Sequence, residues 1–141
     1  MKKYRLEQLI EIFSQNMEQY ETALFRRGEF ANLTLAQIHY LDTIAHLGNP
    51  TVSELALAMK VSKPTATQTM DKLVAKGFVR RVSSETDRRV RNLHLTAAGQ
   101  KLTNEHDSMH REYAEFFRQA LNSEEVEMLE NLLDKVVDRS G

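Results

Sequence analysis

The sequence predicts a mainly α-helical fold with one small β-hairpin. Apolar residues recur at helical spacing through most of the 141 residues, and only two prolines and five glycines interrupt the chain. Alternating runs of β-forming residues occur in only two short segments, residues 78–82 and 90–95. At this length, one domain spanning residues 1–141 is the natural expectation.

The first two helices are predicted from apolar spacing and from capping residues. Residues 4–26 carry an apolar stripe at helical spacing: Leu6, Leu9, Ile10, Phe13, Met17, Tyr20 and Leu24. A short loop follows, and Thr34 is a suitable N-cap for a second helix that ends before Gly48.

The next three elements predict a winged helix–turn–helix. A short third helix spans residues 53–59, and Ser62 caps a fourth helix that tolerates Pro64 in its first turn and ends at Gly77. Two short helices joined by a tight turn are typical of a helix–turn–helix. The two strands and the polar tip between them, residues 83–90, then form a hairpin that we call the wing.

The last two helices predict self-association. Thr96 caps a fifth helix that runs to about Ala120, and a sixth helix begins at Ser123. The first, fifth and sixth helices each expose an apolar stripe, and the central region, residues 34–96, is too small to cover all three. We therefore expect residues 1–33 and 97–141 to form a dimerisation layer with a second copy of the chain.

Charge is distributed very unevenly along the chain. Residues 60–95, the basic segment, hold nine Lys or Arg residues and three acidic residues, a net charge of +6. Residues 1–59 carry a net charge of −2 and residues 96–141 a net charge of −5. A positive segment within a chain of net charge −1 is typical of a surface that faces phosphates, and double-stranded DNA is the expected partner.

The residues expected to contact DNA lie on the fourth helix and in the hairpin. A recognition helix, residues 62–76, can enter the major groove, while the wing reaches the adjacent minor groove or the backbone. Gln68 can pair with adenine, and the lysines can bind phosphates. We expect Asp87 to pair with Arg89 and hold the turn, while either Arg88 or Arg89 points outward. The full set is Ser62, Lys63, Pro64, Thr65, Thr67, Gln68, Lys72, Asp87, Arg88, Arg89 and Arg91.

Several classes of protein are disfavoured by what the sequence lacks. The chain has no cysteine, which excludes disulfides, thiolate metal sites and cysteine nucleophiles. It has no signal peptide and no run of 18 apolar residues, so we expect a soluble cytoplasmic protein. Metal-hydrolase motifs, a Gly-rich phosphate loop and a Gly-x-Ser-x-Gly elbow are also missing, so an enzyme is not expected. A winged-helix module that binds another protein is the main alternative to a DNA-binding regulator, with a metal-dependent enzyme as a more distant one.

Two motifs resemble the MarR family of winged helix–turn–helix transcriptional regulators. The first is VSELALAMKVSKPTATQTMDKLVAKGFVRR, and the second is the wing signature Asp87-x-Arg89-x3-Leu93-x-Leu95-Thr96-x2-Gly99. The resemblance covers nearly the whole chain. It implies an obligate homodimer that represses transcription by binding a palindromic operator, usually under the control of a small ligand or a metal.

Four residues form a candidate metal site. His106 and His110 are four residues apart on the fifth helix, a spacing that lets two imidazoles share an ion. With His39 and Glu21 they would make a tetrahedral Zn²⁺ site if they converge, whereas the alternative is a set of ordinary, partly exposed histidines.

The resemblance to the MarR family leaves the effector open. Glu21, His39, His106 and His110 look like the ligands of its zinc-responsive branch, which regulates zinc uptake. The same four residues also occur in the branch that represses fatty-acid synthesis with an acyl-carrier protein as corepressor. Three stretches look closer to this second branch: those around Arg27-Gly28, residues 38–42 and residues 87–90. The zinc branch also has a second site with a Cys that this chain lacks.

Overall fold

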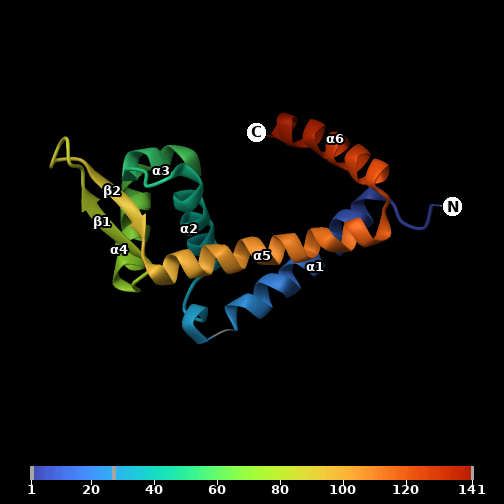
Figure 1. Ribbon diagram of the computed structural model, residues 1–141, viewed down its shortest axis with the longest axis horizontal. Coiled ribbons are helices and arrows are strands. Elements are labelled where there is room, and N and C mark those ends of the chain that lie inside the picture. The colour runs from blue at the N-terminus through green and yellow to red at the C-terminus, as the bar shows by residue number, and fades with distance from the viewer. Residues whose placement is uncertain (1, 27, 141) are drawn as a thin grey trace. The chain divides into compact units, whose positions relative to one another are not determined.

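The computed structural model describes residues 2–26 and 28–140 and confirms the mainly helical prediction (Figure 1). The elements lie close to their predicted bounds, and the short 3-10 helix η1 was not predicted. Their order is α1 (Leu6–Phe25), η1 (Gly28–Phe30), α2 (Leu35–Leu47), α3 (Val52–Met59), α4 (Lys63–Ala75), β1 (Val79–Ser83), β2 (Arg91–Leu95), α5 (Ala97–Ala120) and α6 (Ser123–Ser140).

The chain divides into two compact units. The central unit comprises residues 18–106, and the terminal unit comprises residues 1–17 and 107–141, so α1 and α5 each contribute to both. The central unit extends beyond the predicted winged region, residues 34–96, at both ends. The prediction of one domain over residues 1–141 stays a prediction.

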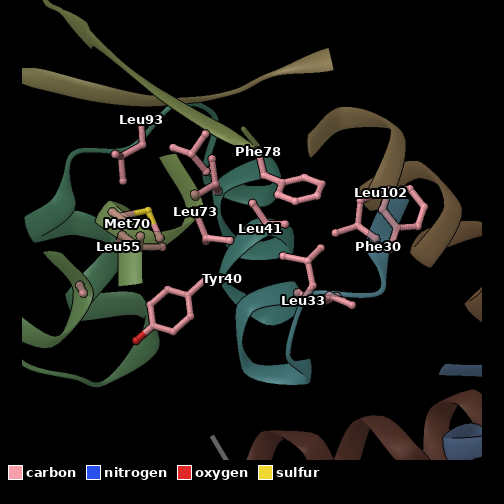
Figure 2. Close-up of a cluster of buried hydrophobic side chains, with 14 of the residues drawn as sticks. Phe30, Leu33, Tyr40, Leu41, Leu55, Met70, Leu73, Phe78, Leu93 and Leu102 are labelled. Atoms are coloured by element: carbon pink, nitrogen blue, oxygen red, sulfur yellow. The ribbon is translucent and has the colours of Figure 1, made fainter. Parts of the chain in front are cut away.

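The hydrophobic core of the central unit joins the helix–turn–helix to the hairpin (Figure 2). Leu41 of α2, Leu55 of α3 and Leu73 of α4 are fully buried and meet Leu93 of β2 in one cluster. Phe30 of η1 is also fully buried, so this unpredicted 3-10 turn contributes a large side chain to the core.

The turn between α3 and α4 has an unusual backbone. Lys60 caps the C-terminus of α3 in the left-handed conformation, with φ of 57°, and its N–H donates to the carbonyls of Ala56 and Leu57. Glycine is the residue that adopts this conformation without strain. Ser62 then starts α4, so the reversal between the two helices takes three residues, 60–62.

The hairpin is a two-stranded antiparallel sheet in which Val79 pairs with Leu95 and Arg81 pairs with Leu93. It is tied to the segment before α3, because the Leu93 N–H donates to the Pro50 carbonyl at 2.7 Å and Asn92 forms an isolated bridge with Thr51. The base of the hairpin is therefore fixed to the core, while its tip extends past α4 (Figure 1).

The start of α5 packs tightly against the strand that opens the hairpin. The Thr96 hydroxyl donates to the Gly77 carbonyl at 2.6 Å and accepts from the Gly99 N–H at 3.2 Å, so Thr96 caps the helix as predicted. The Thr96 N–H donates to the Phe78 carbonyl at 3.0 Å. A Cβ added at Gly99 would lie 2.3 Å from this same carbonyl oxygen.

The terminal unit is held together by aromatic contacts between α1 and α5. The rings of Phe13 and Phe117 lie 5.3 Å apart, and the ring of Tyr113 meets Phe117 edge-on at 5.8 Å. The outer part of α6 is apolar yet more than half exposed over Met128, Leu132, Leu133, Val136 and Val137. Among the described residues, no helix has both the length and the apolar character needed to cross a bilayer.

Candidate nucleic-acid interface

Helix α4 has one face in the core and one face in solvent. Its cap is the Ser62 hydroxyl, which accepts from the Thr65 N–H at 3.2 Å, and Pro64 lies in the first turn as predicted. Ala66, Met70 and Leu73 are buried. The predicted DNA contacts lie on the opposite face: Ser62, Lys63, Pro64, Thr65, Gln68 and Lys72 are exposed, and Thr67 is half-buried.

The tip of the wing is built by hydrogen bonds around Asp87. The Asp87 carboxylate accepts from the Arg89 N–H at 3.0 Å and lies 3.4 Å from the Arg89 Nε. The Val90 N–H donates to the Asp87 carbonyl, and the Ser84 N–H donates to the Val90 carbonyl. Asp87 therefore pairs with Arg89 and holds the turn, as the sequence predicts. The Arg89 side chain is still 93% exposed.

Besides Arg89, two more cations of the basic segment, Lys76 and Arg81, bind partners within the central unit. The Lys76 Nζ donates to the Asn32 carbonyl at 2.5 Å and to the Gln37 Oε1 at 2.9 Å, which ties the end of α4 to the start of α2. Arg81 forms an ion pair with Asp71. The arginines of the tip, Arg88, Arg89 and Arg91, are exposed.

A second cluster lies within the central unit around His106 of α5. The His106 ring is buried, its Nδ1 is 2.5 Å from the Asp42 Oδ2, and its Nε2 is 3.8 Å from the Glu21 Oε1. The hydrogen bond to Asp42 raises the pKa of His106 above its ordinary value, burial opposes this, and the charges of Asp42 and Glu21 raise it further. The exposed ring of His39 lies 6.5 Å from that of His106.

Comparisons with known proteins agree with this geometry. A model of the MarR family matches residues 33–90, which include α2, the helix–turn–helix and most of the hairpin. Over these residues the chain is similar to the MarR family. YsmB of Bacillus subtilis, described as an uncharacterised HTH-type transcriptional regulator, is 29% identical to this chain over 104 residues. That alignment covers 74% of this chain and 71% of YsmB.

Solved structures extend the likeness beyond the matched region. The chain is similar to Streptococcus pneumoniae FabT in complex with DNA, with 28% identity and a TM-score of 0.82, over 94% of this chain and 92% of that one. It also shares its fold with Staphylococcus aureus MepR bound to ethidium bromide, at 23% identity and a TM-score of 0.76, over 99% of each chain.

The predicted DNA contacts all belong to one unit, whereas the four predicted metal ligands are divided between the two units. The contacts on α4 and in the hairpin all belong to the central unit. Glu21, His39 and His106 also belong to that unit, whereas His110 is an exposed residue of the terminal unit. The four-ligand site therefore stays a prediction.

Two side-chain partners were not predicted from the sequence. Asp42 binds His106, which is 64 residues away in the sequence. The sequence offers one hint of this pairing, since Asp42 lies about one turn after the candidate ligand His39 on α2. Arg81 pairs with Asp71, and neither residue was assigned a partner from the sequence. Both pairs join elements that only the tertiary fold brings together.

Proposed function

We infer that the protein is a DNA-binding transcriptional regulator, a repressor that binds an inverted-repeat operator as a homodimer. The observation that carries this inference is the exposed polar face of α4 beside an exposed arginine-rich tip, on one segment with a net charge of +6. FabT, a relative of known structure, was crystallised in complex with DNA. The relatives named above are bacterial, and bacterial DNA lies in the cytoplasm, so this proposal also places the protein there.

Each exposed side chain is given a role according to its chemistry. Gln68, near the middle of the exposed face of α4, can form two hydrogen bonds with an adenine edge, and Thr65 can bind a base edge or a phosphate. Lys63 and Lys72 bind phosphates and contribute affinity without sequence preference. Because Asp87 holds the backbone and the Nε of Arg89, we assign the minor-groove contact to Arg88.

Dimerisation follows from the family and from the terminal unit. MarR-family proteins are dimers. A second copy would cover the exposed apolar residues of α6, such as Leu132 and Val136, which a lone chain leaves in water. Two recognition helices about 34 Å apart would then read successive major grooves of an inverted repeat.

The experiment that tests this function begins with the wild-type protein and a random pool of DNA duplexes. We expect selection to yield an inverted repeat, whose binding weakens steeply as salt rises because phosphate contacts release counterions. Gln68→Ala should relax the preference at one position per half-site by about 1–3 kcal/mol, whereas Lys72→Ala should weaken all duplexes alike. Recovery of no common sequence, together with a flat salt response, would refute the proposal.

The same experiment separates the proposed function from its alternatives. A protein-interaction module would show no DNA affinity, and its partner would occupy the exposed face of α4. The family and its relatives are transcriptional regulators. We accordingly propose that the protein is not an enzyme and that its buried His106 serves structure or regulation rather than turnover.

For the effector, we propose a Zn²⁺ site formed by Glu21, His39, His106 and His110. The donors of Glu21 and His106 support it, because ligands about 2.0–2.1 Å from a tetrahedral ion lie about 3.4 Å apart, close to the 3.8 Å between these atoms. Asp42 would orient His106 through Nδ1 so that Nε2 faces the ion. Bound zinc would supply a cross-link between helices.

Metal analysis of the purified dimer tests the zinc site. We expect stoichiometric zinc in the wild-type protein and its loss in both His106→Ala and His110→Ala. The control is His46→Ala, which changes an exposed histidine on α2 that is outside the proposed ligand set. Zinc that is absent from the wild type, or retained by both variants, would redirect the search to acyl chains and other small molecules.

A further inference from the structure

The negative charge of Asp71 is unexpected on a helix that is proposed to contact DNA. It is the only acidic residue of α4, and it lies on the exposed face between Gln68 and Lys72. A free carboxylate there would repel the phosphates that the neighbouring lysine is expected to bind. Electrostatics alone would therefore favour a neutral or basic residue at this position.

The Asp71 carboxylate is paired with the guanidinium of Arg81. Its Oδ1 lies 2.7 Å from the Nη2 of Arg81, an N–H···O⁻ distance typical of a charge-assisted hydrogen bond. Arg81 pairs with Leu93 across the hairpin, so it lies on the same face of the sheet as that buried leucine, the face turned toward the core. The Arg81 side chain is only 23% exposed, whereas Asp71 is 63% exposed.

This ion pair gives the hairpin a second attachment to α4. The first attachment is the short turn from Lys76 to Phe78, where the Phe78 N–H donates to the Leu73 carbonyl. The base of the hairpin is also fixed to the core by the hydrogen bond from Leu93 to Pro50, which leaves the outer part of β1 to be positioned. The pair at Asp71 and Arg81 lies further out along both elements and restrains this part of β1.

We propose that Asp71 and Arg81 form a brace that sets the position of the wing relative to the recognition helix. Both are positioning residues: they act on DNA through the placement of Gln68 and the arginines of the tip. This inference rests on the proposed function. The negative charge of Asp71 by itself would weaken operator binding. Under this proposal, Asp71 nevertheless strengthens operator binding, because its ion pair with Arg81 positions the wing.

The test is a double-mutant cycle on the full-length dimer with Asp71→Asn, Arg81→Met and the combined variant. Affinity is measured by fluorescence anisotropy for the duplex that wild-type protein selects from a random pool, and for a scrambled duplex of the same length. Arg81→Met keeps the apolar stem, and Asp71 is mostly exposed, so circular dichroism should show folded variants. The matched control is Glu85→Gln, which removes an exposed acidic charge from the wing without breaking the brace.

We expect Asp71→Asn to weaken binding to the selected duplex by about 5- to 30-fold. This range follows if each ion pair changes affinity by a factor of about two to five, because each dimer has two of them. Arg81→Met should weaken binding by a similar factor, and the combined variant should lose little more than either single variant. Glu85→Gln, in contrast, should bind both duplexes slightly more tightly.

Two outcomes distinguish failure of the brace from failure of the proposed function. If the wild-type protein selects an inverted repeat but Asp71→Asn binds it as tightly or more tightly, the brace is wrong and the function stands. The same holds if the losses from the two single variants simply add. If the wild-type protein selects no sequence at all, the proposed function fails first.

Discussion

Substitution of Gly99 by alanine tests how tightly α5 packs against the hairpin. An alanine Cβ would lie 2.3 Å from the Phe78 carbonyl oxygen, at least 0.7 Å closer than the 3.0 Å below which real contacts essentially never occur. The oxygen is a backbone atom that already accepts from the Thr96 N–H, so it cannot move away without breaking a hydrogen bond. Overpacking of this kind costs about 2–3 kcal/mol. The higher helix propensity of alanine offsets about 1 kcal/mol of this cost. The free energy of unfolding should therefore fall by about 1–2 kcal/mol.

Urea unfolding followed by circular dichroism at one fixed protein concentration measures this loss. The concentration must be fixed because dimerisation contributes to the apparent stability. The control is Gly28→Ala, since a Cβ at Gly28 meets no atom within 4 Å and should change the free energy of unfolding by less than about 0.5 kcal/mol. If Gly99→Ala proves as stable as the wild type, the packing argument is wrong.

Three further predictions concern His106, the cap of α5 and the apolar face of α6. The raised pKa of His106 stabilises the fold below its ordinary value of 6.5, and this stabilisation is lost as pH rises through the raised value. Asp42→Asn should therefore lower the free energy of unfolding more at about pH 6 than at about pH 9; an equal loss at both would contradict this. Thr96→Ala should lower it by about 1 kcal/mol, and Thr96→Ser should restore most of that loss in the same urea assay. Val136→Glu should weaken self-association by about tenfold or more, because an unpaired charge at an apolar interface costs several kcal/mol; sedimentation that still shows only dimer would count against the interface.

Local signals explain why most of the fold could be predicted. Thr34, Ser62 and Thr96 each accept a backbone N–H three residues later, so a single side chain marks the start of α2, α4 and α5. Gly77, which ends the fourth helix, and the two alternating runs predict the bounds of both strands to within one residue. The 3-10 helix η1 was not predicted because Phe30, its only apolar residue, lies in a polar loop of the sequence. Phe30 is buried by core residues that are distant in the sequence.

The site could be predicted in its composition but not in its pairings. The exposed face of α4 follows from helical periodicity, because Ala66, Met70 and Leu73 leave Gln68 on the opposite side. The partners of Asp71 and His106 could not be found in this way. Arg81 is 10 residues from Asp71, and Asp42 is 64 residues from His106, so each pair depends on tertiary packing rather than on spacing.

The left-handed lysine in the turn of the helix–turn–helix sets two selective pressures against each other. With φ of 57°, Lys60 holds a conformation that costs an ordinary residue about 1 kcal/mol and costs glycine almost nothing. A laboratory screen for heat tolerance should therefore enrich glycine at this position. Each dimer with glycine at this position would lose two positive charges from the basic segment, so it would be more stable but would bind DNA more weakly.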